Sequence, residues 1–222
     1  VVSVPKDENC CKIGELGCKM EYVQLERRGS NPFHDLKLFL SYRKILKREK
    51  PDLVLTYTIK PNIYGGLASR LCKIPYVMNI TGLGTAIENK TVLSRVLLIL
   101  YRWAAGKAQR VFFQNERNRL FMQGYGVASD NAALLPGSGV NLVEHPFREY
   151  PSEKNGIRFL AVIRIMKDKG IMEFLNAAEE IIKKLPEKSV QFVLAGEYEE
   201  ETRNQYEPLI QRLCENGTIT YL

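Results

Sequence analysis

The sequence predicts an α/β fold in which parallel sheets carry helices on both faces. Short apolar runs rich in β-forming residues alternate along the 222-residue chain with segments of helical period. These runs have the length of ordinary strands, and polar or Gly/Pro-containing clusters separate them. The predicted strands are residues 1–4, 21–25, 52–58, 76–80, 110–113, 132–135, 157–163, 190–195 and 218–222.

Three segments between these strands have clear helical periodicity. In residues 34–49 the apolar side chains fall on one face and the lysines and arginines on another. Residues 92–107 and 170–185 also have the pattern of helices. An α/β sheet of this kind binds its ligands at the carboxyl ends of its strands, so functional residues are expected directly after the apolar runs.

A domain boundary is predicted in residues 144–156, EHPFREYPSEKNG, where prolines, a glycine and mixed charges interrupt both periodicities. We expect a first domain over residues 1–148 and a second over 149–222. Residues 1–150 hold 22 Lys and Arg against 13 Asp and Glu, whereas residues 151–222 hold 10 against 12. The basic first part attracts polyanions, which include anionic lipid, nucleic acid and phosphorylated substrates.

Several classes of protein are excluded by composition. The longest uncharged run, Ile74 to Ile87, contains a proline and two glycines and is too short to span a bilayer. The five cysteines are odd in number and have neither CxxC spacing nor a disulfide framework, which indicates a reduced, cytosolic chain. The chain starts within a predicted strand, and the second domain has few strands for a parallel sheet, so we expect both ends to be truncated.

The strongest candidate site is the segment VIRIMKDKGI, residues 162–171. Arg164 is predicted at the carboxyl end of a strand and Lys169 just before Gly170, where the next helix begins. Two cations beside a helix amino terminus suit a diphosphate, because the free N–H groups and the helix dipole also favour an anion. Spacing alone leaves a second interpretation open, in which both are surface charges of a solvated loop.

This segment resembles the R-x4-K-G motif of the GT-B glycosyltransferases of family 4. Four further segments resemble the bacterial branch that builds capsule, O-antigen and N-glycan precursors on polyprenyl diphosphate. They are KPDLVLTYTIKPNIYGGLASRL, IPYVMNITGLGTAI, VFFQNERNRLFM and LLPGSGVNL, in the family's order and covering roughly residues 21–215. The resemblance implies two Rossmann-like domains of GT-B type, with residues 1–148 on the acceptor side and residues 149–222 as the first part of a donor domain.

The resemblance also implies which residues line the cleft. Arg164 and Lys169 would bind the donor diphosphate. Lys60, Asn62, Thr81, Gly82, Asn115, Gly137 and Gly139 would lie near the substrates. Ordinary structural roles remain open for all of these: Pro61 starts a helix with Asn62 facing solvent, Asn115 caps a helix, and the glycines form turns.

By this resemblance Thr81 occupies the position where related enzymes often carry a histidine, so no histidine base is expected. This departure is compatible with a retaining reaction in which the leaving phosphate accepts the acceptor's proton. The expected reaction moves a sugar from a nucleotide-diphosphate donor, a UDP-sugar, to a polyprenyl-diphosphate-linked or saccharide acceptor in cell-surface polysaccharide synthesis. We expect neither a metal nor a cofactor, and an isolated chain of this length that is inactive.

The expected location is cytoplasmic, peripheral at the inner face of a bacterial cell membrane, through contact with anionic lipid. Two alternatives stay open. One is a nucleotide-sugar 2-epimerase of the same architecture, for which no paired carboxylates and histidine can be placed. The other is a basic module that binds membrane or nucleic acid, and the βα order without an aromatic platform argues against nucleic acid as a partner.

Overall fold

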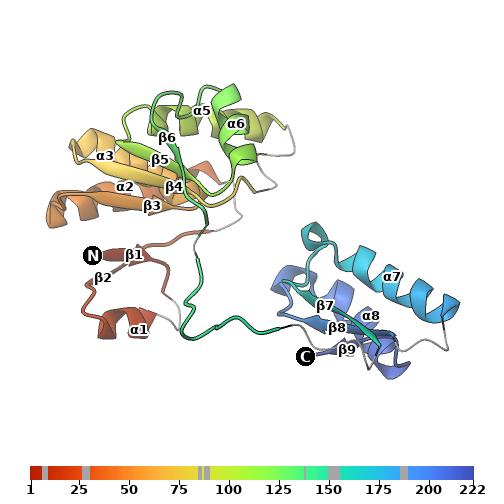
Figure 1. Ribbon diagram of the computed structural model, residues 1–222. Coiled ribbons are helices and arrows are strands. Elements are labelled where there is room, and N and C mark those ends of the chain that lie inside the picture. Colours follow the sequence, from red (N-terminus) through yellow and green to blue (C-terminus); the bar gives the residue numbers. More distant parts are fainter. Residues whose placement is uncertain are drawn as a thin grey trace. The chain divides into compact units, whose positions relative to one another are not determined.

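The computed structural model describes residues 1–6, 10–26, 31–84, 87, 91–137, 139–149, 156–185 and 190–222. The chain forms two compact units, unit 1 over Val1–His145 and unit 2 over Pro146–Leu222. Each unit is an α/β structure with strands that run parallel (Figure 1). The predicted α/β class with parallel sheets is therefore confirmed.

Unit 1 contains two parallel sheets. Strands β1 (Val2–Val4) and β2 (Met20–Tyr22) pair with each other and are connected through the short helix α1 (Cys10–Glu15). The larger sheet has the order β3-β4-β5-β6, so every strand pairs with its successor in the chain. These strands are Val54–Tyr57, Tyr76–Ile80, Arg110–Phe113 and Ala132–Leu134. Parallel pairing of successive strands places all four carboxyl ends at one edge of the sheet.

Three helices of unit 1 begin at side chains that satisfy one of their first free N–H groups. Asn31 caps α2 (Pro32–Glu49), Thr91 caps α5 (Val92–Ala105) and Asn115 caps α6 (Glu116–Gly124). Between β3 and β4 the chain forms one π-helical turn, η1 (Pro61–Gly65), which continues as α3 (Gly66–Cys72). Within the described residues, we find no helix that is both long enough and apolar enough to cross a bilayer.

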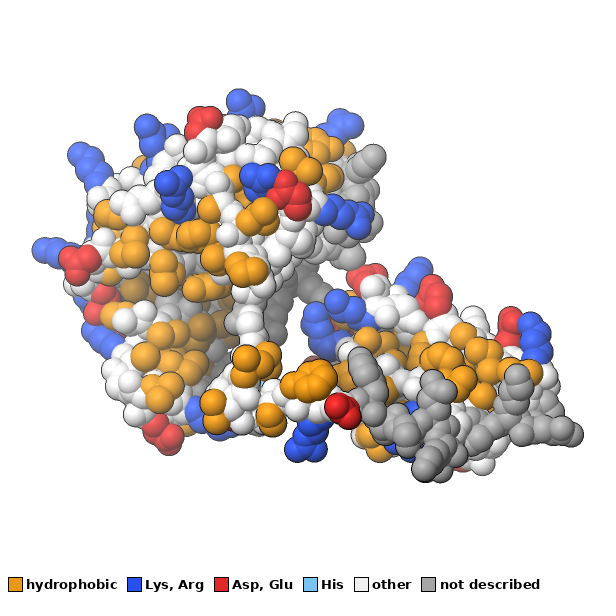
Figure 2. Space-filling view, in the orientation of Figure 1, with side chains coloured by type: hydrophobic (Ala, Val, Ile, Leu, Met, Phe, Trp, Pro, Cys, Tyr) orange, Lys and Arg blue, Asp and Glu red, His pale blue; other side chains and the backbone are white. Residues whose placement is uncertain are grey.

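The main core of unit 1 lies between one face of the larger sheet and its helices. Tyr76, Met78 and Ile80 alternate along β4 with side chains on the opposite face, and they are buried against α5 and α6. On the opposite face Leu55 and Tyr57 are half exposed. Figure 2 shows hydrophobic side chains of unit 1 open to solvent between lysine and arginine side chains.

Unit 2 is a three-stranded parallel sheet with two longer helices. Its strands are β7 (Ile157–Val162), β8 (Val190–Ala195) and β9 (Thr220–Tyr221), in that order. Helices α7 (Ile171–Lys184) and α8 (Arg203–Glu215) share one apolar cluster with β8, in which Leu175, Phe192 and Ile210 are buried. Two short 3-10 turns, η3 (Lys167–Lys169) and η4 (Glu200–Thr202), precede these helices.

The sequence placed the nine strands correctly to within a few residues, and it predicted the three longest helices. It gave no bounds for α1, α3, α6 or α8, although it expected a helix to start at Pro61 and another after Asn115. The first two are too short for a helical period to stand out, and α8 contains Pro208, which interrupts the pattern.

We expect Gly196→Ala to destabilise unit 2 by about 3 kcal/mol or more, because the backbone there admits no side chain. Gly196 has φ of 148°, and a Cβ would lie 1.9 Å from the carbonyl oxygen of Ile163. Gly217 is the matched control, since its φ is also positive, at 74°, but a Cβ would meet open space. Gly217→Ala should cost only about 1 kcal/mol in denaturant unfolding. Equal losses in the two variants would contradict the close approach.

Candidate functional site

In unit 1 the predicted site residues follow the carboxyl ends of the larger sheet. Lys60 and Asn62 come after β3, and Thr81 and Gly82 come after β4. Asn115 comes after β5, and Gly137 and Gly139 follow β6. The fold thus brings the four segments to the same edge of the sheet, as expected for a parallel arrangement.

Asn62 holds the loop after β3 to the middle of the sheet. Its side chain is fully buried, its Oδ1 accepts a hydrogen bond of 2.7 Å from Thr56 Oγ1, and its Nδ2 donates one of 3.0 Å to the carbonyl of Asn79. Asn62 therefore connects β3 with β4. The interpretation that it faces solvent is wrong, and a buried amide engaged on both sides has a positioning role where a direct substrate contact was expected.

Lys60 forms an ion pair within the protein. Its ammonium group lies 2.7 Å from Asp35 Oδ1, and the Tyr64 hydroxyl donates a 2.9 Å hydrogen bond to Asp35 Oδ2. The Lys60 and Asp35 side chains are only 14% and 16% exposed. Burial, followed by the hydrogen bond to Asp35, raises the pKa of Tyr64 above its ordinary value, so the phenol remains protonated and donates. An anion at Lys60 would have to share this cation with the Asp35 carboxylate.

Thr58 has a backbone conformation that a β-branched residue seldom adopts. Its φ is 65°, in the left-handed region, and its carbonyl accepts a 3.0 Å hydrogen bond from the N–H of Asn62. The strain lies at the turn between β3 and η1, where the chain must reverse into a helix within three residues. Strain of this kind is held by the surrounding structure, here by the buried Asn62.

The remaining predicted residues of unit 1 are at the surface of this edge. Thr81 is exposed, and a Cβ at Gly82 would meet open space. Gly137 and Gly139 are exposed with φ of 85° and 73°, which fits turns. Asn115 is the amino-terminal cap of α6, since its Oδ1 accepts a 2.8 Å hydrogen bond from the N–H of Asn118. The capping role expected for Asn115 is therefore confirmed.

In unit 2 the parallel pairing continues beyond the strand ends and positions the loop after β7. The N–H of Ile163 donates to the carbonyl of Ala195, and the N–H of Ile165 to that of Glu197. This continuation is possible because Gly196 lets the two chains approach closely. Arg164 lies between the two paired residues, two residues after β7 ends.

Arg164 and Lys169 are both exposed in this loop. Arg164 Nη1 lies 3.7 Å from Glu199 Oε1, and the guanidinium side chain is 66% exposed. Lys169 ends the turn η3, and Gly170, with φ of 75°, then leads into α7. No side chain caps the amino end of α7. The loop thus presents three cations, Arg164, Lys167 and Lys169, before a helix terminus, which can attract a phosphate group, with the Glu199 carboxylate near Arg164.

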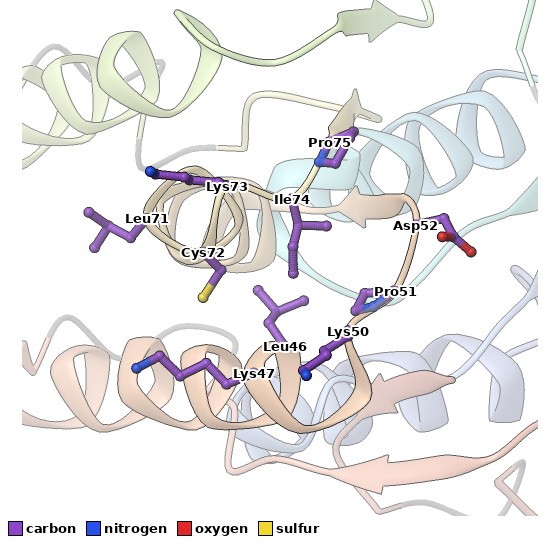
Figure 3. A pocket seen from close by; sticks show the side chains of 10 residues that line it. All are labelled: Leu46, Lys47, Lys50, Pro51, Asp52, Leu71, Cys72, Lys73, Ile74 and Pro75. Atoms are coloured by element: carbon purple, nitrogen blue, oxygen red, sulfur yellow. The ribbon is translucent and has the colours of Figure 1, made fainter.

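The open pocket in unit 1 lies at the other end of the sheet (Figure 3). It has a volume of about 620 Å³ between the carboxyl ends of α2 and α3, before β3 and β4 begin. Figure 3 shows Leu46, Cys72 and Ile74 pointing into it, while the lysine ammonium groups do not converge. Lys50 and Lys73 end the two helices in the left-handed conformation, where a cation complements the helix dipole. The pocket has no residue of the predicted site.

Sequence reasoning missed Asp35, Thr56, Gly196 and Glu199. Asp35, Gly196 and Glu199 act through partners distant in the chain, so local spacing gives little sign of them, whereas the partner of Thr56 is only six residues away. A glycine directly after the apolar run of β8 was the one local signal, since such a position often marks a close backbone approach.

Comparison with known proteins gives a consistent result. Residues 1–115 match the family described as glycosyl transferase 4-like. The chain is 29% identical over 211 residues to the N,N'-diacetylbacillosaminyl-diphospho-undecaprenol alpha-1,3-N-acetylgalactosaminyltransferase of Campylobacter jejuni, covering 88% of this chain and 55% of that protein. It is 26% identical over 178 residues to the UDP-Gal:alpha-D-GlcNAc-diphosphoundecaprenol alpha-1,3-galactosyltransferase of Escherichia coli, covering 74% and 45%. The chain therefore spans about half the length of these relatives.

Solved structures share the fold at low sequence identity. HepE of Anabaena in complex with UDP superposes with a TM-score of 0.71 at 16% identity, covering 99% of this chain and 60% of that one. The UDP-N-acetylglucosamine 2-epimerase of Rickettsia bellii gives 0.56 at 14% identity, covering 100% and 60%. Identities this low show the fold alone, and the fold does not separate transferases from epimerases.

We expect Asn62→Ala to cost about 2–3 kcal/mol of unfolding free energy, because it leaves the buried Thr56 hydroxyl and the Asn79 carbonyl without this partner. Asn115→Ala is the control, since it removes an exposed helix cap and should cost about 1 kcal/mol. Denaturant unfolding of both variants measures the difference. A smaller loss for Asn62→Ala than for Asn115→Ala would contradict the positioning role.

Thr58→Gly should raise the unfolding free energy by about 0.5–1 kcal/mol, because glycine adopts a φ of 65° without strain. Thr81→Gly at the same edge is the control, since Thr81 does not have a positive φ and the change only increases the freedom of the unfolded chain. In thermal unfolding we expect Thr58→Gly to be more stable than the parent chain and Thr81→Gly to be less stable. Destabilisation by both changes would show that Thr58 is unstrained.

Proposed function

The chain belongs to the glycosyl transferase 4-like family, and on this premise we propose that it serves the transfer of a sugar from a UDP-sugar to a polyprenyl-diphosphate-linked saccharide in cell-surface polysaccharide synthesis. Both relatives described above are named as transferases that act on sugars linked to undecaprenyl diphosphate. Their agreement on the lipid-linked acceptor supports this substrate class for the present chain. The sugar and the linkage differ between the two and are left open here.

The observation that supports the proposal is that Arg164 and Lys169 are both exposed in the segment between β7 and α7, with Lys169 directly before Gly170 at the amino end of α7. In the proposed reaction the bond between the sugar's anomeric carbon and the donor phosphate breaks, and the leaving UDP gains negative charge. A guanidinium group and an ammonium group beside it would stabilise that charge more strongly in the transition state than in the bound donor. Glu199 Oε1 lies 3.7 Å from Arg164 Nη1, so a bound diphosphate would compete with this carboxylate for the guanidinium group.

We further propose that the transfer retains the anomeric configuration. The acceptor hydroxyl would attack from the face that the phosphate leaves, and its proton would pass to the departing phosphate oxygen. This route requires no separate general base, which agrees with an exposed Thr81 after β4. Residues 149–222 then form the first part of the donor side, and residues 1–148 form the acceptor side.

On the acceptor side, the edge after β3–β6 offers loops that a substrate could approach closely. Gly82, Gly137 and Gly139 present backbone without side chains, and a Cβ at each would meet open space. Lys60 would contribute to binding of the lipid diphosphate only together with Asp35, as a neutralised pair. A polyprenyl acceptor resides in a membrane, so we place the protein at the inner face of the cell membrane as a peripheral protein.

Titration of UDP into the 222-residue chain by calorimetry tests the donor site. Arg164→Gln and Lys169→Gln should each weaken binding about tenfold, because each removes one charge-assisted contact at an exposed site. Lys167→Gln is the matched control, since it removes the same charge from an exposed position in the same loop. It should change the affinity less than twofold.

Two results would contradict the assignment of the donor site. One is an affinity for UDP that falls equally in all three variants, which would indicate general attraction to a basic loop. The other is UDP binding that neither Arg164→Gln nor Lys169→Gln alters. In the intact protein, loss of sugar transfer in the same two variants, with Lys167→Gln active, is the expected functional counterpart.

A further inference from the structure

Helix α5 exposes apolar side chains on the side that faces away from its core. Val92, Val96, Ile99 and Trp103 recur at intervals that place them on one helical face, and they are 78%, 47%, 52% and 58% exposed. We call these four residues the α5 outer face. The opposite side of the helix is also apolar, and its Leu98 and Tyr101 belong to the main core of unit 1.

A solvated surface helix normally carries polar side chains on its outer side. A helix that is apolar all round is expected where both sides are in apolar surroundings. Helix α5 packs beside α3 in unit 1 (Figure 1), which accounts for its inner side only. A contiguous exposed apolar strip of this kind marks an interaction surface.

The charged residues of α5 itself have a single sign. Arg95 and Arg102 lie seven residues apart on one flank of the strip, and both are exposed. At the carboxyl end of the helix, Arg70 of α3 donates a 2.9 Å hydrogen bond to the carbonyl of Trp103. Residues 91–115 contain four basic residues, the other two being Lys107 and Arg110, and no Asp or Glu before Glu116. The outer side of α5 is therefore apolar along its centre, and arginines of the same helix lie on its flank.

We propose that the α5 outer face docks unit 1 on a bilayer that contains anionic phospholipid. This inference deepens the proposed function, on which it rests for the presence of a membrane-bound acceptor. The aliphatic side chains would enter the boundary between headgroups and acyl chains, and the arginines would contact the lipid phosphates. Trp103 would sit at the headgroup level, where an indole ring has both apolar and polar surroundings.

The helix would lie along the membrane surface. Its 14 residues give a length of about 21 Å, whereas the hydrocarbon core is about 30 Å thick. Its inner side is also occupied by the protein core, so only the outer face is available to lipid.

Charge complementarity favours lipid over a second copy of the chain. Two copies that joined through this face would bring Arg95 and Arg102 of each toward the same residues of the other. No acidic residue between positions 91 and 115 could pair with them. Like charges at such a contact oppose association, whereas an anionic bilayer neutralises all of them.

The experiment uses the only tryptophan of the chain, Trp103, as its probe. Vesicles of phosphatidylcholine with 30% phosphatidylglycerol, a composition chosen at roughly the charge of anionic membranes, are titrated into the 222-residue chain. We expect a saturable blue shift of the emission and quenching by lipids brominated near the headgroup. Pure phosphatidylcholine vesicles should bind more weakly, and added salt should weaken binding to the anionic vesicles.

Matched variants distinguish vesicle binding through the α5 outer face from nonspecific adsorption of the protein to vesicles. Ile99→Glu should reduce vesicle affinity at least tenfold, whereas Val143→Glu, at an aliphatic residue that is 90% exposed outside α5, should leave it within twofold. Arg95→Gln with Arg102→Gln should reduce affinity about 25-fold, since each basic residue near an anionic surface contributes about 1 kcal/mol, or fivefold. Lys183→Gln with Lys184→Gln removes the same charge from exposed positions of α7 and should have little effect.

Three results would overturn the inference: unchanged Trp103 emission with anionic vesicles, equal loss in Ile99→Glu and Val143→Glu, or concentration-dependent self-association without lipid that Ile99→Glu abolishes. Ile99→Ser serves as a milder variant should Ile99→Glu fail to fold. UDP affinity is measured in parallel on every variant. If the chain binds UDP but not vesicles, the docking face alone is refuted. If it binds vesicles but not UDP, the proposed donor site alone is refuted.

Discussion

One buried side chain, the amide of Asn62, fixes the loop on which the candidate site of unit 1 depends. It accepts from Thr56 on β3 and donates to the Asn79 carbonyl on β4, so it fastens the start of η1 across two strands. With this bond in place, Thr58 is held at a strained φ and Lys60 is brought to Asp35. A polar group in the core is tolerated because both ends of the amide have partners. Removing it would break the link between this loop and both strands, while Lys60 and Tyr64 would keep their contacts with Asp35.

Unit 2 positions its loop by a different means, the backbone itself. Pairing between the two chains continues past the ends of β7 and β8 as far as Ile165 and Tyr198, and Gly196 makes this approach sterically possible. Arg164 is therefore placed by the backbone, while its side chain remains exposed. In both units a rigid connection close to the strand end positions the loop that follows, which is the arrangement expected of sites on α/β sheets.

Whether the sequence could predict a feature depends on how far apart in the chain the interacting residues lie. The strands, the longest helices and the cap at Asn115 depend on neighbouring residues, and all of these were predictable. The Lys60–Asp35 pair joins residues 25 positions apart, and the residues of the Arg164–Glu199 pair are still further apart in the chain. No local sequence pattern therefore predicts either pair. Asn62 was misjudged because an asparagine next to a helix-starting proline is usually solvated, and only the packed sheet reveals that it is buried.

The positions of individual charged residues in the structure say more about anion binding than the uneven charge of the sequence does. The basic first part suggested attraction to polyanions, but its central cation at the strand edge, Lys60, is already neutralised by Asp35. The cations of α5 instead border an apolar strip on an outer helix, in a stretch without acidic residues. Unit 2 carries an excess of acidic residues over its sequence and yet presents Arg164 and Lys169 in one loop. The net charge of either part of the chain therefore does not predict where an anion binds. An anion is attracted mainly by the few cations within a Debye length of it.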